Sequence, residues 1–181
     1  MSSEGAPEQG WVFRNRFIRV RNEPVIFPGG IRGEHVSVHP ACEGEISGVV
    51  MLPYWDGRFV LCRNFRHPTR RWMIETPRGS LDQSEDPPVA ARRELLEEYG
   101  VEGHMELLGR VSPDDGLLAA DALVYWCTLA ALPEAVGEHH KMPPLVWDTQ
   151  ALVRAIANGE VQDGFLISGL MLAIARGVVA L

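Results

Sequence analysis

The segment from Gly79 to Val101 places more constraints on this chain than any other part of its sequence. It reads G-S-L-D-Q-S-E-D-P-P-V-A-A-R-R-E-L-L-E-E-Y-G-V. Asp86 is suited to the N-cap of a helix, the two prolines that follow suit a first helical turn, and Gly100 suits the left-handed residue just after a helix. The spacing therefore predicts one short helix over Asp86–Tyr99.

Three glutamates share one face of this expected helix. Glu94 and Glu98 are four residues apart, and Glu97 is three residues from Glu94. Like charges at this spacing repel by a few tenths of a kcal/mol per exposed pair. Divalent cations between the carboxylates would remove the repulsion, and Mg²⁺ prefers a few carboxylates together with water and phosphate oxygens. A solvated acidic surface is the simpler alternative for such a helix.

The residues around the helix favour the metal-binding interpretation. Gly79 allows a tight turn that leaves the carbonyl of Arg78 free to face the metals. Glu85 and Arg93 have the charges needed to pair and to hold the loop against the helix. An ordinary surface ion pair is the alternative for Arg93, and it would contribute little to stability.

The whole segment fits G-x5-E-x7-R-E-U-x-E-E-x-G-U, with U aliphatic, at every fixed position. It thereby resembles the signature of the Nudix hydrolase family, a class of enzymes acting on phosphorus-containing anhydrides. The resemblance implies Mg²⁺ (or Mn²⁺) as cofactor and an α/β fold, an α/β/α sandwich with a mixed β-sheet. The residues expected to bind metal are Arg78 (through its carbonyl), Glu94, Glu97 and Glu98. Those expected to act in catalysis are Arg93, Glu97 and Glu98, and the structural positions of the signature are Gly79, Glu85 and Gly100.

The similarity extends beyond this signature. The segments R-N-F-R-H-P (63–68), W-M-I-E-T-P-R-G (72–79), S-P-D-D-G (112–116) and N-G-E-V-Q-D-G-F (158–165) resemble motifs of ADP-ribose pyrophosphatases and the related GDP-mannose pyrophosphatases. The resemblance implies hydrolysis of the pyrophosphate bond of a nucleoside diphosphate derivative, with ADP-ribose giving AMP and ribose 5-phosphate. GDP-mannose, another nucleotide sugar, a nucleoside triphosphate or a dinucleoside polyphosphate are alternative substrates. A sensor that binds a nucleotide sugar without cleaving it is a further alternative, which the intact glutamates disfavour.

Two departures from the motifs leave the substrate open. Arg78 replaces the commoner alanine and adds a cation at the expected phosphate site. Pro113 follows Val101 by twelve residues, nearer than expected for the ADP-ribose group, and two aspartates come after it.

Four further residues are candidates for substrate contact or proton transfer. Arg63 and Arg66 suit phosphate groups, Arg66 the better because a guanidinium forks over phosphate oxygens. Solubility at a sheet edge is the alternative for both. Glu75 is a candidate ligand for a sugar hydroxyl. The alternative is that it only forms an ion pair at the end of a strand. The resemblance makes Glu138 the candidate general base, with Glu134 as the substitute, although a loop glutamate is often only solvated.

The length and the pattern of strands predict one main domain. We expect a strand region over 1–45, which mediates dimerisation, and a Nudix domain over 46–181. At 181 residues and 46% hydrophobic content, the chain can form one real core. The strands expected before the Nudix domain are Trp11–Val20 and Val25–Phe27, with a charged turn at Arg21–Glu23, and Glu34–Val38. This region is too small for a core of its own, and the family resemblance implies a homodimer built through it.

Charge and cysteine content limit the partners and the compartment. The net charge of −7 argues against a nucleic-acid or anionic-membrane partner and leaves a small nucleotide sugar as the expected ligand. Cys42, Cys62 and Cys127 are odd in number and have no C-x-x-C spacing, which predicts buried thiols in a reducing compartment. The N-terminus is polar and acidic, unlike a signal peptide, so we expect a cytoplasmic protein. The apolar segment Phe165–Leu181 is short for a membrane span and predicts a buried helix.

Overall fold

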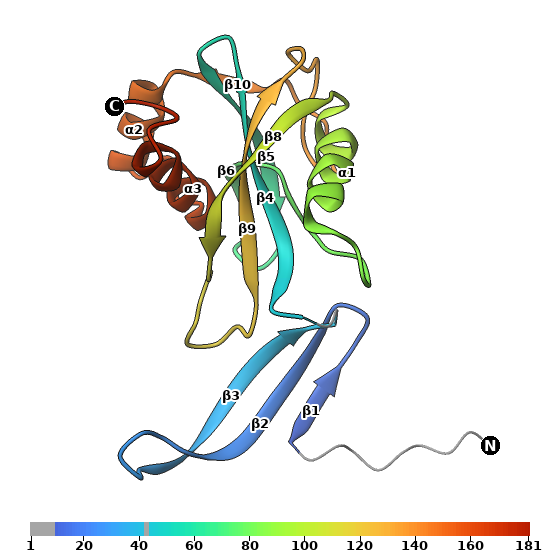
Figure 1. The fold of residues 1–181 in the computed structure, drawn as a ribbon, viewed down its shortest axis with the longest axis vertical. Helices are drawn as coiled ribbons and strands as arrows, with labels where there is room; N and C mark the ends of the chain where they lie inside the picture. Colours follow the sequence, from blue (N-terminus) through green and yellow to red (C-terminus); the bar gives the residue numbers. More distant parts are fainter. Residues whose placement is uncertain (1–9, 42–43) are drawn as a thin grey trace, which may run out of the picture.

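The structure, a computed structural model, describes residues 10–41 and 44–181. Its main body is a mixed sheet with helices on both faces, so the predicted α/β/α sandwich is confirmed (Figure 1). Helix α1 (Pro87–Tyr99) covers one face, and α2 (Thr149–Ala157) and α3 (Gly164–Ala175) cover the other.

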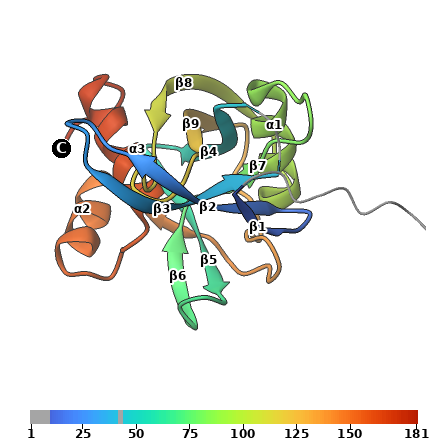
Figure 2. The ribbon, with the colours of Figure 1, turned by 90° about the horizontal axis from the view of Figure 1, so that it is seen from below.

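The main sheet has the strand order β10-β5-β4-β9-β8, with β6 paired to β5 and β7 paired to β4. The β4–β9 pair is parallel, and the other pairs are antiparallel. Figure 2 shows the β5–β6 hairpin extending beyond the body of the sheet. The strands are β4 (Ile46–Trp55), β5 (Arg58–Arg66), β6 (Arg71–Glu75), β7 (Arg78–Ser80), β8 (Gly103–Val111), β9 (Asp121–Leu129) and β10 (Leu145–Trp147).

Two hydrophobic cores lie on opposite faces of this sheet. Because successive side chains of a strand point to opposite faces, β4 contributes to both cores. Val50 and Leu52 pack in the core beneath α2 and α3, whereas Val49 and Met51 pack in the core beneath α1. All four side chains are buried, so the central strand is apolar on both faces.

A second, three-stranded antiparallel sheet precedes the main body and stands apart from it in Figure 1. It consists of β1 (Trp11–Arg14), β2 (Ile18–Ile26) and β3 (Arg32–Pro40). Two backbone hydrogen bonds link β3 to the loop before β9: Val38 N–H to Leu117 O, 2.8 Å, and Ala119 N–H to Val38 O, 2.9 Å.

The turn in this small sheet differs from the sequence prediction. The chain turns at 15–17, and Arg21–Glu23 lies inside β2. The side-chain oxygen of Asn15 accepts hydrogen bonds from the N–H groups of Phe17 and Ile18, both 2.8 Å, and this stabilises the turn. Arg21 and Glu23 form an ion pair of 2.8 Å, because residues two apart in a strand share a face.

Helix α1 begins and ends where the sequence predicts, but its N-terminus lacks the expected side-chain cap. Gly100 has a φ of 66°, the left-handed conformation expected after a helix. Asp86 precedes the helix, yet its side chain makes no capping hydrogen bond. The next two residues are prolines, which have no N–H, and the N–H of Val89 donates to the backbone oxygen of Asp86 instead.

The prediction of buried cysteines agrees with the structure where it describes them, and the prediction of a C-terminal helix agrees in part. Cys62 and Cys127 are buried, and burial raises the pKa of each thiol to about 12. Cys42 lies outside the described residues. Of the apolar segment predicted to be a helix, the residues up to Ala175 belong to α3, which packs on the sheet, whereas residues 176–181 are not helical. Across 10–41 and 44–181, no helix has both the length and the apolarity required to span a bilayer.

Candidate active site

A cavity of about 490 Å³ lies where β4 and β7 meet α1 and the start of α3. Its lining is strongly charged. The charged residues on it are Arg66, Arg78, Asp82, Arg93, Glu94, Asp121 and Glu138.

Gly79 on β7 brings the backbone close to Glu94 on α1. A Cβ atom at position 79 would lie only 1.9 Å from Glu94 Cδ. A side chain at this position would force the Glu94 carboxylate to move, so the glycine is what lets this carboxylate lie so close to the backbone. This contact places the Glu94 carboxylate against the β7 backbone at the wall of the cavity.

The three helix glutamates have different surroundings. The Glu98 residue is 4% exposed; its Oε1 accepts the Arg78 backbone N–H at 3.1 Å, while its Oε2 is buried without a hydrogen-bond partner. Burial is the main cause that raises the pKa of Glu98 to about 7, and the charges of Glu138 and Glu94 add to it. Burial also raises the pKa of Glu94. The Glu97 side chain is 59% exposed and lies 3.5 Å from Arg93.

Arg93 fastens the loop before α1 to the helix, as the sequence predicts. Its Nε and Nη2 atoms donate to the two carboxylate oxygens of Glu85, at 3.0 and 2.9 Å. Its Nη1 donates to Glu94 Oε1 at 2.8 Å, and its Nη2 also donates to Ser80 O at 3.1 Å. The hydrogen bond from Arg93 is the main cause that lowers the pKa of Glu85 to about 2. Glu85 is therefore ionised at neutral pH, and Arg93 connects it to Glu94.

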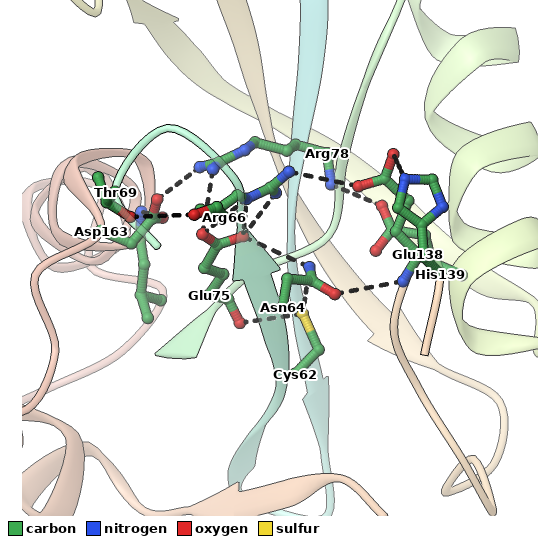
Figure 3. Close-up of polar contacts among 11 residues, drawn as sticks. Cys62, Asn64, Arg66, Thr69, Glu75, Arg78, Glu138, His139 and Asp163 are labelled. Carbon is green, nitrogen blue, oxygen red and sulfur yellow. Dashed lines mark hydrogen bonds and ion pairs between the residues drawn. The ribbon is translucent and has the colours of Figure 1, made fainter. Parts of the chain in front are cut away.

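Two arginines share one buried carboxylate on the other wall of the cavity (Figure 3). Glu75, at the end of β6, is 1% exposed. Arg66 donates two hydrogen bonds to Glu75, from Nη2 to Oε2 at 2.6 Å and from Nε to Oε1 at 2.9 Å. Arg78 approaches the same Oε1 with its Nη2 atom at 3.3 Å. In this structure Glu75 thus fixes both guanidinium groups.

The start of α3 holds the Arg78 guanidinium from its other side. Asp163 caps α3, since its Oδ1 accepts the Leu166 N–H at 2.8 Å, and its Oδ2 pairs with Arg78 Nη1. The Arg78 guanidinium also lies over the ring of Phe165, 5.0 Å from its centroid. Helix α3 and strand β7 are joined through this one side chain.

The candidate base Glu138 lies on a loop held at several points. Its N–H donates to Asn64 Oδ1 at 3.3 Å, and its Oε2 lies 3.3 Å from Arg66 Nη1. The loop is closed by paired backbone hydrogen bonds between Val136 and Met142. Lys141 Nζ donates to the carbonyls of Glu97 and Glu98, at 2.6 and 2.7 Å, at the C-terminal end of α1. The loop and the glutamate helix are therefore tied together.

The structure does not bring every candidate to this cavity. Five candidates are absent from its lining: Arg63, Glu75, Glu97, Glu98 and Glu134. Glu75 and Glu98 nevertheless contact lining residues, since Glu75 binds the Arg66 side chain and Glu98 accepts the Arg78 backbone N–H. Arg63 alternates with Cys62 and Asn64 along β5, so it points to the opposite face of the strand.

Sequence reasoning did not identify Asp163, Phe165, Asn64 or Lys141 as site residues. The position of Asp163 could be inferred from the sequence, because an aspartate directly before an apolar helix is typical of an N-cap. Lys141 was noticeable too, because it is the single lysine of the chain.

The glutamates fit the divalent cation that the Nudix resemblance implies. Among the residues described, no group of three or more His, Cys, Asp or Glu side chains is arranged to hold a metal ion. However, the buried Oε2 of Glu98 has no hydrogen-bond partner in the part of the chain that the structure describes, and a buried carboxylate oxygen without one is unfavourable. A cation between Glu98 and Glu94 would satisfy this oxygen, and carboxylates are the ligands that Mg²⁺ takes.

Known proteins resemble this chain in sequence and in fold. An RNA pyrophosphohydrolase of Caulobacter vibrioides is 45% identical over 73 residues, which is 40% of each chain, so the chain spans less than half of that relative. An ADP-ribose pyrophosphatase of Mycobacterium tuberculosis is 28% identical over 158 residues, covering 84% of this chain and 74% of the relative. A crystal structure of an ADP compounds hydrolase has the same fold, with a TM-score of 0.74 at 20% identity over 93% of both chains.

The family model of the NUDIX domain matches residues 44–138, more than half of the chain. The matched region contains β7 and α1 and ends at Glu138, within the loop between β9 and β10. The chain therefore belongs to the NUDIX domain family.

Proposed function

We propose that the protein hydrolyses the pyrophosphate bond of a nucleoside diphosphate derivative, with ADP-ribose as the leading substrate and AMP and ribose 5-phosphate as products. The observation that carries this proposal is the buried Glu98 oxygen without a partner, beside Glu94. It supports a cation site next to a cavity that also presents guanidinium groups. Similarity to an ADP-ribose pyrophosphatase over 84% of the chain supports the choice of substrate.

The residues that would hold Mg²⁺ or Mn²⁺ are Glu94, Glu97, Glu98 and the Arg78 carbonyl. When bound, such an ion neutralises phosphate charge, activates a water and stabilises the leaving phosphate. Arg93 keeps the Glu94 carboxylate oriented and offsets part of the acidic charge of α1. Gly79 permits the close approach of Glu94 to the backbone.

Arg66 is the proposed phosphate ligand on the opposite wall. Its guanidinium is fixed by Glu75, which is also the cause that raises the pKa of Arg66, so its charge and direction are set before substrate binds. Glu138 is the proposed general base, because it reaches the cavity from a loop anchored to Asn64 and α1. Arg63 remains a weaker proposal as a phosphate contact.

The decisive experiment is product analysis by chromatography after incubation of pure protein with ADP-ribose. Parallel reactions contain Mg²⁺, Mn²⁺ or a chelator, and Glu98→Gln is the control variant. We expect metal-dependent AMP and ribose 5-phosphate, both lost in the variant. Turnover of GDP-mannose, another nucleotide sugar or a nucleoside triphosphate in place of ADP-ribose would change the substrate but keep the reaction. Failure with all of them would favour a protein that only binds nucleotide sugars.

We also propose that the protein is a cytoplasmic homodimer assembled through the N-terminal sheet. This sheet exposes large apolar side chains, among them Phe13, Phe17, Ile26, Ile31 and Val36. Because apolar patches on a small sheet are unfavourable in water, a second copy of the chain is the occupant that we propose. Light scattering at micromolar concentration should give a dimer mass, and Ile26→Asp should lower it. Met171→Glu on α3, where the side chain is exposed to a similar extent, is the matched control. A monomer mass for the wild-type protein would contradict the proposal.

A further inference from the structure

The Arg78 side chain occupies a place that the proposed reaction does not explain. The proposed metal site involves only the backbone of Arg78, whose N–H donates a hydrogen bond to Glu98. The guanidinium extends to the wall opposite α1, beside Arg66, and lines the cavity. Two cationic groups therefore face the substrate space together on this wall.

Both guanidinium groups are held rigidly. Glu75 contacts both of them, and it is almost completely buried. Arg78 is held in addition by the buried Asp163 and by the ring of Phe165. A guanidinium has five N–H donors, and the contacts of Arg78 with Glu75 and Asp163 use two of them. Fixed donors with unused N–H groups form a preorganised binding surface for an oxyanion.

The structure shows one oxyanion already bound on this wall. The Glu138 carboxylate lies 3.3 Å from Arg66 Nη1, although the two residues are 72 positions apart. The Glu138 side chain is 43% exposed, and its contact with Arg66 is longer than the contacts between Arg66 and Glu75. An exposed carboxylate at this distance is exchangeable, since such pairs contribute little to stability. A substrate oxyanion could replace it.

Without Glu138, the charges on the wall balance. Arg66 and Arg78 carry two positive charges, and Glu75 and Asp163 carry two negative charges that lie buried behind them. The buried carboxylates are fully engaged, whereas the guanidinium groups face the cavity. The charged groups that this wall presents to the cavity are thus the two guanidinium groups and the exchangeable Glu138 carboxylate.

We infer that Arg66 and Arg78 form a second oxyanion subsite, which accepts a phosphate or carboxylate on the non-nucleoside part of the substrate. Arg78 is then the residue that determines specificity, since its guanidinium adds a second cationic donor group beside that of Arg66. The inference rests on the proposed function for the identity of the substrate. It predicts that a nucleoside diphosphate derivative whose second moiety carries an anionic group is cleaved with a higher kcat/KM than its neutral counterpart, and ADP-ribose, with its neutral ribose, counts among the neutral ones.

Titration with inorganic phosphate tests the subsite without any need for hydrolysis. Calorimetry on metal-free protein should show phosphate binding that Arg78→Ala weakens about 10-fold or more, the loss expected for a charged hydrogen-bond partner. Glu138→Gln should tighten binding, because it removes the competing carboxylate. Arg92→Ala, which changes an exposed arginine of α1 outside the cavity, should leave binding within about twofold.

A second variant at Arg78 distinguishes loss of the binding group from disruption of the surrounding structure. Arg78→Lys keeps a charge beside Asp163 but loses the fork, and should give intermediate binding. If wild-type protein fails to bind millimolar phosphate, or if Arg78→Ala and Glu138→Gln both bind it as wild type does, the subsite is overturned.

Hydrolysis of a matched pair of substrates tests specificity. ADP-glucose and its analogue oxidised at C6 differ only at that carbon, where a hydroxymethyl group is replaced by a carboxylate. The wild-type enzyme should favour the carboxylated compound in kcat/KM by about 10-fold, and Arg78→Ala should abolish the preference mainly through KM. Equal rates in the wild-type enzyme overturn the specificity role. If neither these compounds nor ADP-ribose are cleaved, the proposed function fails, and the phosphate titration still decides whether the subsite exists.

Discussion

The buried glutamate of the metal-binding helix should destabilise the metal-free protein at alkaline pH. Glu98 is 4% exposed and has one carboxylate oxygen without a partner. Its pKa is raised from the usual 4.5 to about 7, chiefly by burial. We therefore predict that Glu98→Gln, which cannot ionise, stabilises the protein at pH 8.

The size of this effect follows from the two pKa values. A group whose pKa is higher in the folded state stabilises folding fully below its unfolded pKa, and this contribution is lost as the pH rises through the folded pKa. For Glu98 the loss extends from pH 4.5 to above pH 7 and reaches about 3 kcal/mol at pH 8. The glutamine leaves one buried N–H group without a partner, at a cost of about 1 kcal/mol. The net gain should be about 2 kcal/mol at pH 8 and about zero at pH 5.

Urea unfolding with a chelator present at pH 5 and pH 8 measures both values. Glu97→Gln is the matched control, because it removes the neighbouring carboxylate, which is 59% exposed, and should change stability at both pH values by less than about 0.5 kcal/mol. Mg²⁺ should stabilise the wild-type protein and not Glu98→Gln. If Glu98→Gln is less stable than wild type at pH 8 in the chelator, the carboxylate has a partner that this reasoning omits, and the argument fails.

Three further substitutions test the frame of the site. Gly79→Ala should lower the hydrolysis rate by about 100-fold, because its Cβ would lie 1.9 Å from Glu94 Cδ and would displace that carboxylate; Gly164→Ala, with open space around its Cβ, should retain the wild-type rate. Lys141→Met should cost about 1 kcal/mol in urea unfolding, since it removes two hydrogen bonds from the carbonyls at the end of α1, and an unchanged midpoint would contradict this. Glu75→Gln should cost about 3–5 kcal/mol in the same assay, because two partly buried guanidinium groups would lose their shared carboxylate; a loss below about 1 kcal/mol would show that the arginines find other partners.

Local interactions made the helix and its loop predictable from the sequence. Gly100 and the two prolines mark the ends of α1, and Glu85 and Arg93 are only eight residues apart. These features depend only on residue types at short spacings along the chain, and such spacings can be read directly from the sequence. The misplaced turn in the N-terminal sheet shows the limit, since Arg21 and Glu23 are as compatible with a strand pair as with a turn.

The opposite wall of the cavity depends on contacts that no local spacing encodes. Arg78 and Asp163 are 85 residues apart, and Arg66 and Glu138 are 72 residues apart. These pairs form only when the sheet brings β5 and β7 beside the start of α3 and the loop before β10. Sequence motifs identified Arg66, Glu75 and Glu138 as candidates singly, but the pairing among them required the fold.

The two buried glutamates of the site differ in what satisfies their charge. Glu75 is surrounded by the donors of Arg66, Arg78 and Asn64, so its negative charge is neutralised within the protein. Glu98 receives only one backbone N–H, and the remaining charge has no partner among the described side chains. Because an uncompensated buried charge is unfavourable, it persists only where a ligand supplies the partner or where function requires it. The site around the cavity therefore has one buried carboxylate that fixes the arginines and another that is left for a cation, and substitutions to glutamine should change stability in opposite directions at the two positions.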